Sequence, residues 1–150
     1  MTVVDDSGLD YEQRFAAARE AMAAREMDAM LLTGGPNLVY FTGATGMLEG
    51  TSGSRPIFCV LPADGDPVLL AHTLIGGELE RSTPIQDIRT YERLSDLPTA
   101  ELRDLLESRG VASGRLGVEF GVETRFDAPV EDLLDFVEDL PGLSVVDAAG

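Results

Sequence analysis

Six short apolar runs, separated by turns and by segments with helical periodicity, constrain the fold more than any other feature of this 150-residue sequence. The runs cover residues 29–32, 57–61, 68–71, 85–91, 116–120 and 143–146. Runs of this length suit β-strands and are too short for buried helices. Because strands and helices alternate along most of the chain, we predict an α/β fold. It should be a three-layer α/β/α sandwich with helices on both faces of a mixed sheet of about six strands.

Apolar residues at helical spacing predict the segments between these runs. We expect helices at residues 10–27, 73–81, 98–109 and 127–140, and a single helical turn at 36–41. Asp10 and Asp127 are the expected N-caps, with Gln13 completing a capping box after Asp10. The last helix should be buried through four apolar side chains: Val130, Leu133, Leu134 and Val137.

The length of the chain fits one domain better than two. No apolar run approaches the roughly 18 residues of a membrane-spanning helix, and residues 1–10 lack the pattern of a secretory signal. The single cysteine, Cys59, fits a reducing compartment. We therefore expect a cytoplasmic protein with no membrane partner.

The charge balance is strongly acidic, with 27 acidic residues, 11 basic residues and a net charge of -16. Such a surface repels phosphate groups, which argues against nucleic acid as a partner. At about 1 M salt the Debye length falls to about 3 Å, so like charges then repel one another little. Because the acidic residues are spread along the chain, we predict a source in a salt-accumulating halophilic archaeon. The alternative is an acidic mesophilic protein.

Few residues of the sequence suggest catalysis. All 11 basic residues are arginines, which excludes mechanisms that need a lysine. We expect the lone His72 to bond to backbone groups at the end of a strand, and Cys59 to be a buried apolar side chain. Gly34-Gly35 follows a strand but does not form a dinucleotide-binding motif. We assign no catalytic, cofactor-binding or metal-binding residue to the chain.

Several stretches resemble the N-terminal part of the creatinase and prolidase family, the metallopeptidases that include Xaa-Pro dipeptidases and aminopeptidases. The most specific stretch is Pro36-Asn37-Leu38-Val39-Tyr40-Phe41-Thr42-Gly43. The others are residues 14–22, 27–33, 58–62, 67–70, 88–91, 115–119 and 143–148. Together they extend over nearly all of residues 11–148.

This resemblance implies that residues 11–150 form the family's metal-free N-terminal domain, behind a tail at residues 1–10. In the family, a following domain supplies two aspartates, a histidine and two glutamates, which hold two divalent metal ions. That catalytic domain would be absent from this chain and would be its partner in the complete protein. We therefore expect the chain alone to hold no cofactor and to have no peptidase activity.

The resemblance also implies a homodimer, in which a loop of one N-terminal domain borders the active site of the other subunit. The matching segment is residues 40–55, and the gating residues would be Tyr40, Phe41, Leu48 and Arg55. Arg55 could bind a substrate carboxylate with two hydrogen bonds. The alternative is that both aromatic residues belong to the core and that Arg55 is a solvated surface cation.

Three hypotheses for function follow. The first is a non-catalytic N-terminal domain of an Xaa-Pro peptidase, which contributes dimerisation and caps the active site of the partner subunit. The second is a free-standing α/β binding or interaction module without a peptidase role. The third is a small-ligand domain of flavodoxin-like type.

Overall fold

The computed structural model describes residues 10–43, 56–122, 124 and 126–149. Five helices and six strands occur in this part of the chain. Their order is α1 (Tyr11–Ala24), β1 (Ala29–Leu32), α2 (Gly35–Thr42), β2 (Phe58–Pro62), β3 (Val68–His72), α3 (Thr73–Ser82), β4 (Asp87–Tyr91), α4 (Thr99–Ser108), β5 (Arg115–Val118), α5 (Val130–Glu138) and β6 (Ser144–Asp147). Within the described residues, no helix has the length and apolar character of a membrane span.

All six strands belong to one mixed sheet, in the order β4-β3-β2-β1-β5-β6. β2 is antiparallel to both of its neighbours, β1 and β3. The pairs β3–β4, β1–β5 and β5–β6 are parallel. Five strands therefore run in one direction, and their carboxyl ends meet at a single edge of the sheet, which we call the carboxyl edge.

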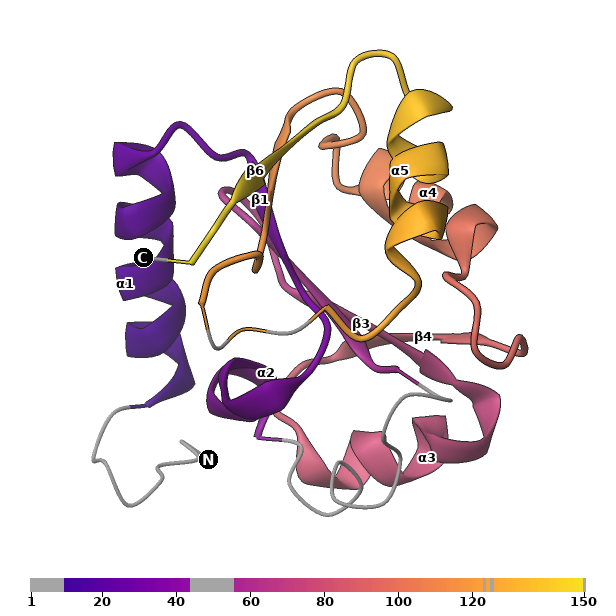
Figure 1. The fold of residues 1–150 in the computed structure, drawn as a ribbon. Helices are drawn as coiled ribbons and strands as arrows, with labels where there is room; N and C mark the ends of the chain where they lie inside the picture. Colours follow the sequence, from indigo (N-terminus) through magenta and orange to yellow (C-terminus); the bar gives the residue numbers. More distant parts are fainter. Residues whose placement is uncertain (1–9, 44–55, 123, 125, 150) are drawn as a thin grey trace.

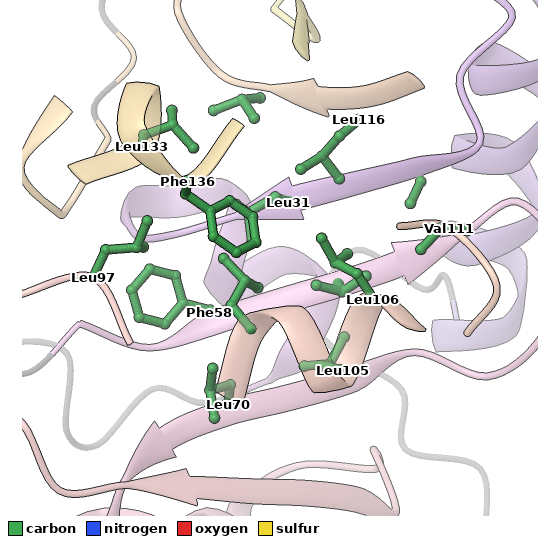
Figure 2. Close-up of a cluster of buried hydrophobic side chains, with 14 of the residues drawn as sticks. Leu31, Phe58, Leu70, Leu97, Leu105, Leu106, Val111, Leu116, Leu133 and Phe136 are labelled. Atoms are coloured by element: carbon green, nitrogen blue, oxygen red, sulfur yellow. The ribbon is translucent and has the colours of Figure 1, made fainter. Parts of the chain in front are cut away.

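Two separate apolar cores lie on the two faces of the sheet. Helices cover both faces, which confirms the predicted three layers (Figure 1). α4 and α5 cover one face, where Leu105 and Phe136 pack with Phe58 and Leu31 of the central strands (Figure 2). α1, α2 and α3 cover the other face. Because successive side chains of a strand point to opposite faces, Phe58 contributes to the first core and Cys59 to the second.

The ends of α1 follow local chemistry. The Asp10 carboxylate accepts a hydrogen bond of 2.8 Å from the Gln13 N–H, so the predicted cap is confirmed. The helix stops at Ala24, before the predicted end, because Glu26 adopts a left-handed φ of 55°. The Met27 N–H then donates back to the Met22 carbonyl at 2.9 Å, and the buried Met27 side chain anchors the turn.

α2 is longer than the single predicted turn, with eight residues from Gly35 to Thr42. Pro36 lies in its first turn, where a missing backbone N–H costs little. Gly43 ends the helix in the left-handed region, with φ 71° and its N–H bonded to the Val39 carbonyl. Glycine suits this position because a Cβ would be strained at positive φ.

The prediction for α5 was wrong in two respects. The helix begins at Val130, and Asp127 does not cap it; the Asp127 N–H instead donates to the Thr33 hydroxyl, 3.0 Å away beside β1. Val130 and Leu134 were expected to be buried but are 53% and 64% exposed. Leu133 and Phe136 are the buried residues of α5, and the partly buried Val137 and Leu140 pack beside them, so Val130 and Leu134 point away from the core.

Candidate functional site

The two aromatic residues that were predicted to belong to a gate, Tyr40 and Phe41, differ in how far they are buried. Phe41 is partly buried and packs against the second core, with its ring stacked on that of Phe15 at 6.2 Å between centroids. Tyr40 is 38% exposed and meets Phe41 edge-on at 5.0 Å. Leu48 and Arg55 lie outside the described residues. The core alternative therefore fits Phe41, and Tyr40 is available at the surface.

A buried arginine, which the sequence analysis did not identify as a site residue, holds Tyr40 in place. Arg14 is only 2% exposed, and its Nη1 donates to the Tyr40 carbonyl at 2.6 Å. Its guanidinium also lies over the rings of Tyr40, at 4.4 Å, and Tyr11, at 4.8 Å. The sequence did contain a signal for the burial of Arg14, because this residue shares a helical face with Ala18 and Met22 at intervals of four residues.

Exposed apolar side chains occur in the connections that follow the parallel strands. Every large hydrophobic side chain that is exposed in the described ranges lies in a connection leaving the carboxyl edge. They are Tyr40, Leu74, Leu94, Phe120, Val122, Val130 and Leu134, and we call them the edge residues. Leu74 is 72% exposed and Val122 is 94% exposed. Large apolar side chains that remain exposed are candidates for an interaction site.

His72 has the structural role that its position predicted. It is the N-cap of α3, where Nδ1 accepts a hydrogen bond from the Leu74 N–H at 3.2 Å. Nε2 lies 3.2 Å from the Glu92 carbonyl and carries the proton that this bond requires. Both ring nitrogens are thus engaged with the backbone, as expected of a structural histidine.

The Cys59 thiol is also structural. It is fully buried in β2, and burial raises its pKa to about 12, so the reactive thiolate is suppressed. Within the described ranges no three His, Cys, Asp or Glu side chains are grouped so that they could hold a metal ion. These residues therefore do not fit the two-metal centre of the family, and we assign no hydrolytic step to them.

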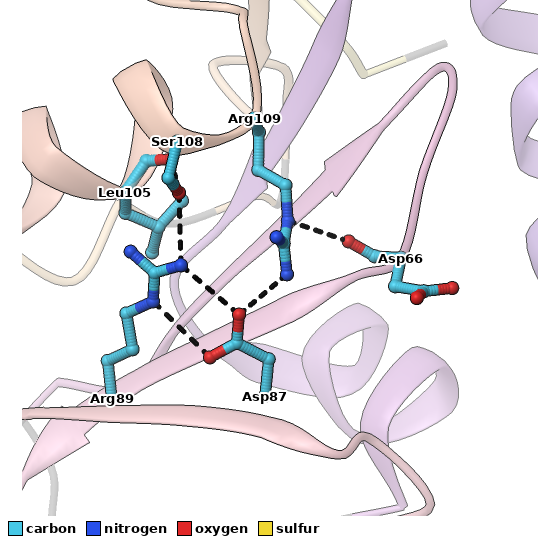
Figure 3. A network of polar contacts seen from close by, with 6 residues as sticks. All are labelled: Asp66, Asp87, Arg89, Leu105, Ser108 and Arg109. Carbon is cyan, nitrogen blue, oxygen red and sulfur yellow. Dashed lines mark hydrogen bonds and ion pairs between the residues drawn. The ribbon is translucent and has the colours of Figure 1, made fainter.

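The main network of charged groups lies at the opposite edge of the sheet (Figure 3). Asp87, the first residue of β4, pairs with Arg89 at 3.2 Å and with Arg109 at 2.6 Å. The hydrogen bond from Arg89, with the charges of both arginines, holds the pKa of the Asp87 carboxyl below its usual range. Because Arg109 also donates to the Asp66 carbonyl, the network joins β4, α4 and the β2–β3 turn. Its role is structural.

Comparison with known proteins gives one family and a consistent set of folds. The profile of the creatinase/prolidase N-terminal domain matches residues 14–150. No curated protein sequence matches the chain.

Three solved structures illustrate the similarity. A dipeptidase from Pyrococcus horikoshii is 24% identical with a TM-score of 0.65, over 90% of this chain and 34% of that protein. The dipeptidase PepE from Mycobacterium ulcerans is 23% identical with a TM-score of 0.66, over 97% of this chain and 36% of that protein. The N-terminal domain of the cytoplasmic peptidase PepQ from Mycobacterium tuberculosis is 22% identical with a TM-score of 0.66, over 92% of this chain and 94% of that structure.

This chain thus spans about a third of the length of the complete dipeptidases that it resembles. Both the sequence profile, which covers all but the first 13 residues, and the six-stranded α/β fold point to the same assignment. The chain belongs to the creatinase/prolidase N-terminal domain family.

Proposed function

We propose that this chain is the non-catalytic N-terminal domain of an Xaa-Pro dipeptidase- or aminopeptidase-like metallopeptidase. In this role it makes a homodimer contact and caps the active site of the partner subunit. Hydrolysis would be performed by a metal-binding domain to which the chain is joined, as its one-third coverage of two complete dipeptidases supports. The observation that carries the proposal is the exposure of the edge residues in connections that follow the parallel strands.

The apolar character of this edge supports a contact with protein in preference to solvent. Leu74 and Leu94 follow the parallel pair β3 and β4, whereas Phe120 and Val122 follow β5. A charge of -16 keeps the rest of the molecule well hydrated and repels a second copy at random orientations. An apolar edge is then the place where two copies could approach with the smallest electrostatic penalty.

Tyr40 supports the capping part of the proposal. Its backbone carbonyl and its ring are both held by Arg14, so its position is fixed at the surface immediately before the chain leaves α2. Residues 43–55 begin at the left-handed Gly43 and contain Leu48 and Arg55. We propose that this segment borders the partner subunit's active site, with Arg55 binding the carboxylate of a short peptide.

Sedimentation of two variants tests the dimer. Leu74→Glu places a charge on the proposed contact, and the first turn of a helix tolerates an acidic residue, so folding should be preserved. Ala63→Glu is the matched control, because it adds the same charge at an exposed position on the opposite edge. We expect Leu74→Glu to weaken dimerisation at least tenfold and Ala63→Glu to leave it unchanged. Equal dimerisation by both variants, or a monomeric parent chain, would favour a free-standing interaction module.

Steady-state kinetics of the complete protein tests the cap. Arg55→Ala should raise KM for Xaa-Pro dipeptides more than it lowers kcat, because the lost contact is to a substrate carboxylate that is neither broken nor formed in the reaction. Arg55→Lys should recover part of the binding. An unchanged KM for Arg55→Ala would refute the proposed contact.

We also propose that the protein works in the cytoplasm of a halophilic archaeon. The acidic surface and the arginine-only basic residues support this setting. A buried, unreactive cysteine is compatible with it.

A further inference from the structure

A second potential site, distinct from the edge residues and beyond the proposed function, lies inside the fold. A pocket of about 210 Å³ opens between α1, α2 and the sheet. It is lined by Ala18, Ala21, Met22, Arg25, Met27, Met30, Leu32, Asn37, Phe41, Glu119 and Ala148. The lining is mainly apolar, with only three polar side chains.

The polar end of this pocket, with Asn37 and Glu119, lies near a change in the direction of the connections. β1 and β5 are parallel neighbours, and the connections that leave their carboxyl ends diverge. α2 covers one face and leads to β2, whereas α5 covers the other face and leads to β6. In α/β sheets, the crevice between two such strands is the usual place for a small ligand.

Glu119 is the feature that points to a ligand. It directly follows β5 and is only 8% exposed, which is unusual for a carboxylate. One oxygen, Oε1, accepts a hydrogen bond from Nδ2 of Asn37, which lies in α2. No donor within the described ranges is bonded to Oε2, and Glu119 is one of the residues that line the pocket. A carboxylate whose side chain is largely buried favours a hydrogen-bond donor that carries positive charge.

The walls of the pocket suit the remainder of such a cation. Met22, Met27 and Met30 offer polarisable thioethers, and Phe41 adds an aromatic ring. A volume of about 210 Å³ holds roughly seven non-hydrogen atoms at about 30 Å³ each, so the enclosed part of the ligand is small. Arg25 lies on the exposed side, where its Nη2 donates to the Asp147 carbonyl at 2.8 Å.

We infer that this pocket binds a small alkylammonium group, with the ammonium bonded to Glu119 Oε2 and to the Asn37 amide oxygen, and the alkyl body against the three methionines. Two kinds of molecule carry this group: a simple aliphatic amine, and an aliphatic α-amino acid whose carboxylate would reach Arg25. The shared chemistry is the ammonium on a short branched chain.

Titration by heteronuclear NMR tests the inference, in salt at which the protein is folded. The probe is 3-methylbutylamine, and its two controls are 3-methylbutanol, without charge, and 3-methylbutanoate, with the opposite charge. We expect saturable shifts of residues around Glu119 with the amine and much weaker effects with both controls. Equal effects of all three compounds, or no saturation with the amine, would overturn the inference.

Three variants distinguish the site from a general effect of charge. Glu119→Gln keeps the size of the side chain and should weaken amine binding at least tenfold. Glu78→Gln removes an exposed carboxylate on α3 and should leave binding unchanged. Ala21→Leu, at an exposed position on α1 that lines the pocket, should block binding without touching Glu119. Unchanged affinity in a folded Ala21→Leu or Glu119→Gln protein would refute the site.

Leucine separates the two sources of the ammonium group. If the natural ligand is an amino acid, leucine should bind more tightly than the amine, and Arg25→Gln should remove that advantage. If it is a simple amine, leucine should bind no more tightly, and Arg25→Gln should have little effect. Either result supports an alkylammonium site. Failure of both leucine and 3-methylbutylamine to bind would overturn it.

Discussion

Arg109 at the end of α4 places its Nη2 atom 2.6 Å from Oδ2 of Asp87, the first residue of β4. Asp87 is bonded to Arg89 as well, so one carboxylate joins a helix to the edge strand of the sheet (Figure 3). Since 34% of the Asp87 side chain remains exposed, water screens both ion pairs.

Asp87→Asn should lower the free energy of unfolding by about 0.5–1 kcal/mol at pH 7 and low salt. Because the folded-state pKa of Asp87 is lowered, this stabilisation is present above the unfolded pKa of about 3.9 and is lost as the pH falls through the folded-state value. Urea titrations at pH 7 and at pH 3 should show the difference shrinking in acid. Asp104→Asn, which removes an exposed carboxylate on α4, is the control. An equal loss of stability in that variant would contradict a stabilising role for the network.

Cys59 should resist thiol reagents until the protein unfolds. Burial raises its pKa to about 12, whereas an unfolded cysteine has a pKa of about 8.5. The folded state therefore disfavours the thiolate, and this contribution to stability should decline as the pH rises above about 8.5. Labelling with a chromogenic disulfide at pH 8, with and without urea, measures both accessibility and ionisation. Rapid labelling of the native protein would contradict the assigned burial.

Two adjacent leucines of α5 should differ sharply when each is replaced by alanine. Leu133 is 1% exposed and packs in the core of Figure 2, whereas Leu134 is 64% exposed. Leu133→Ala should cost about 2–5 kcal/mol, because it removes apolar contacts and leaves a cavity. In the monomer, Leu134→Ala should change the free energy of unfolding by less than about 0.5 kcal/mol. Chemical denaturation of the pair provides the measurement, and similar midpoints would mean that α5 is rotated differently.

The melting temperature should rise with salt. Acidic residues outnumber arginines by 27 to 11, so repulsion among the carboxylates is largely uncompensated at low salt. Between 0.1 and 2 M KCl we expect an increase of at least about 8 °C, or roughly 3 kcal/mol for a chain of this size. Sucrose, which favours compact states without screening charge, is the comparison. Equal midpoints at both KCl concentrations would count against a halophilic source.

The strands were the most predictable part of the fold. The runs at residues 29–32, 57–61 and 68–71 are apolar at nearly every position because both faces of these strands are covered by helices. The start of α5 was harder to predict, because the Asp127 N–H bonds to the hydroxyl of Thr33, which is distant in the sequence. Rules for helix caps use only local sequence and cannot predict that contact. A capping preference of about 1 kcal/mol is easily outweighed by such tertiary interactions.

The site was predicted only in part. Tyr40 was identified through the family resemblance, but its support by Arg14 depends on a helix that packs beside α2. The Glu119–Asn37 pair joins residues that are 82 positions apart, and only the parallel pairing of β1 with β5 brings them together. Local periodicity carries no information on which strands become neighbours, so this contact could not be derived from it.

The central position of β1 has a consequence for how the chain acquires its structure during synthesis. β1 pairs with β2 soon after both emerge from the ribosome, but its other neighbour, β5, follows only at residue 115. Until then, one side of β1 presents unsatisfied backbone donors and acceptors in an apolar strand, which is a template for pairing with other nascent chains. A fragment that ends before residue 115 should therefore aggregate, and docking of β5 onto β1 should be a late, slow event in folding.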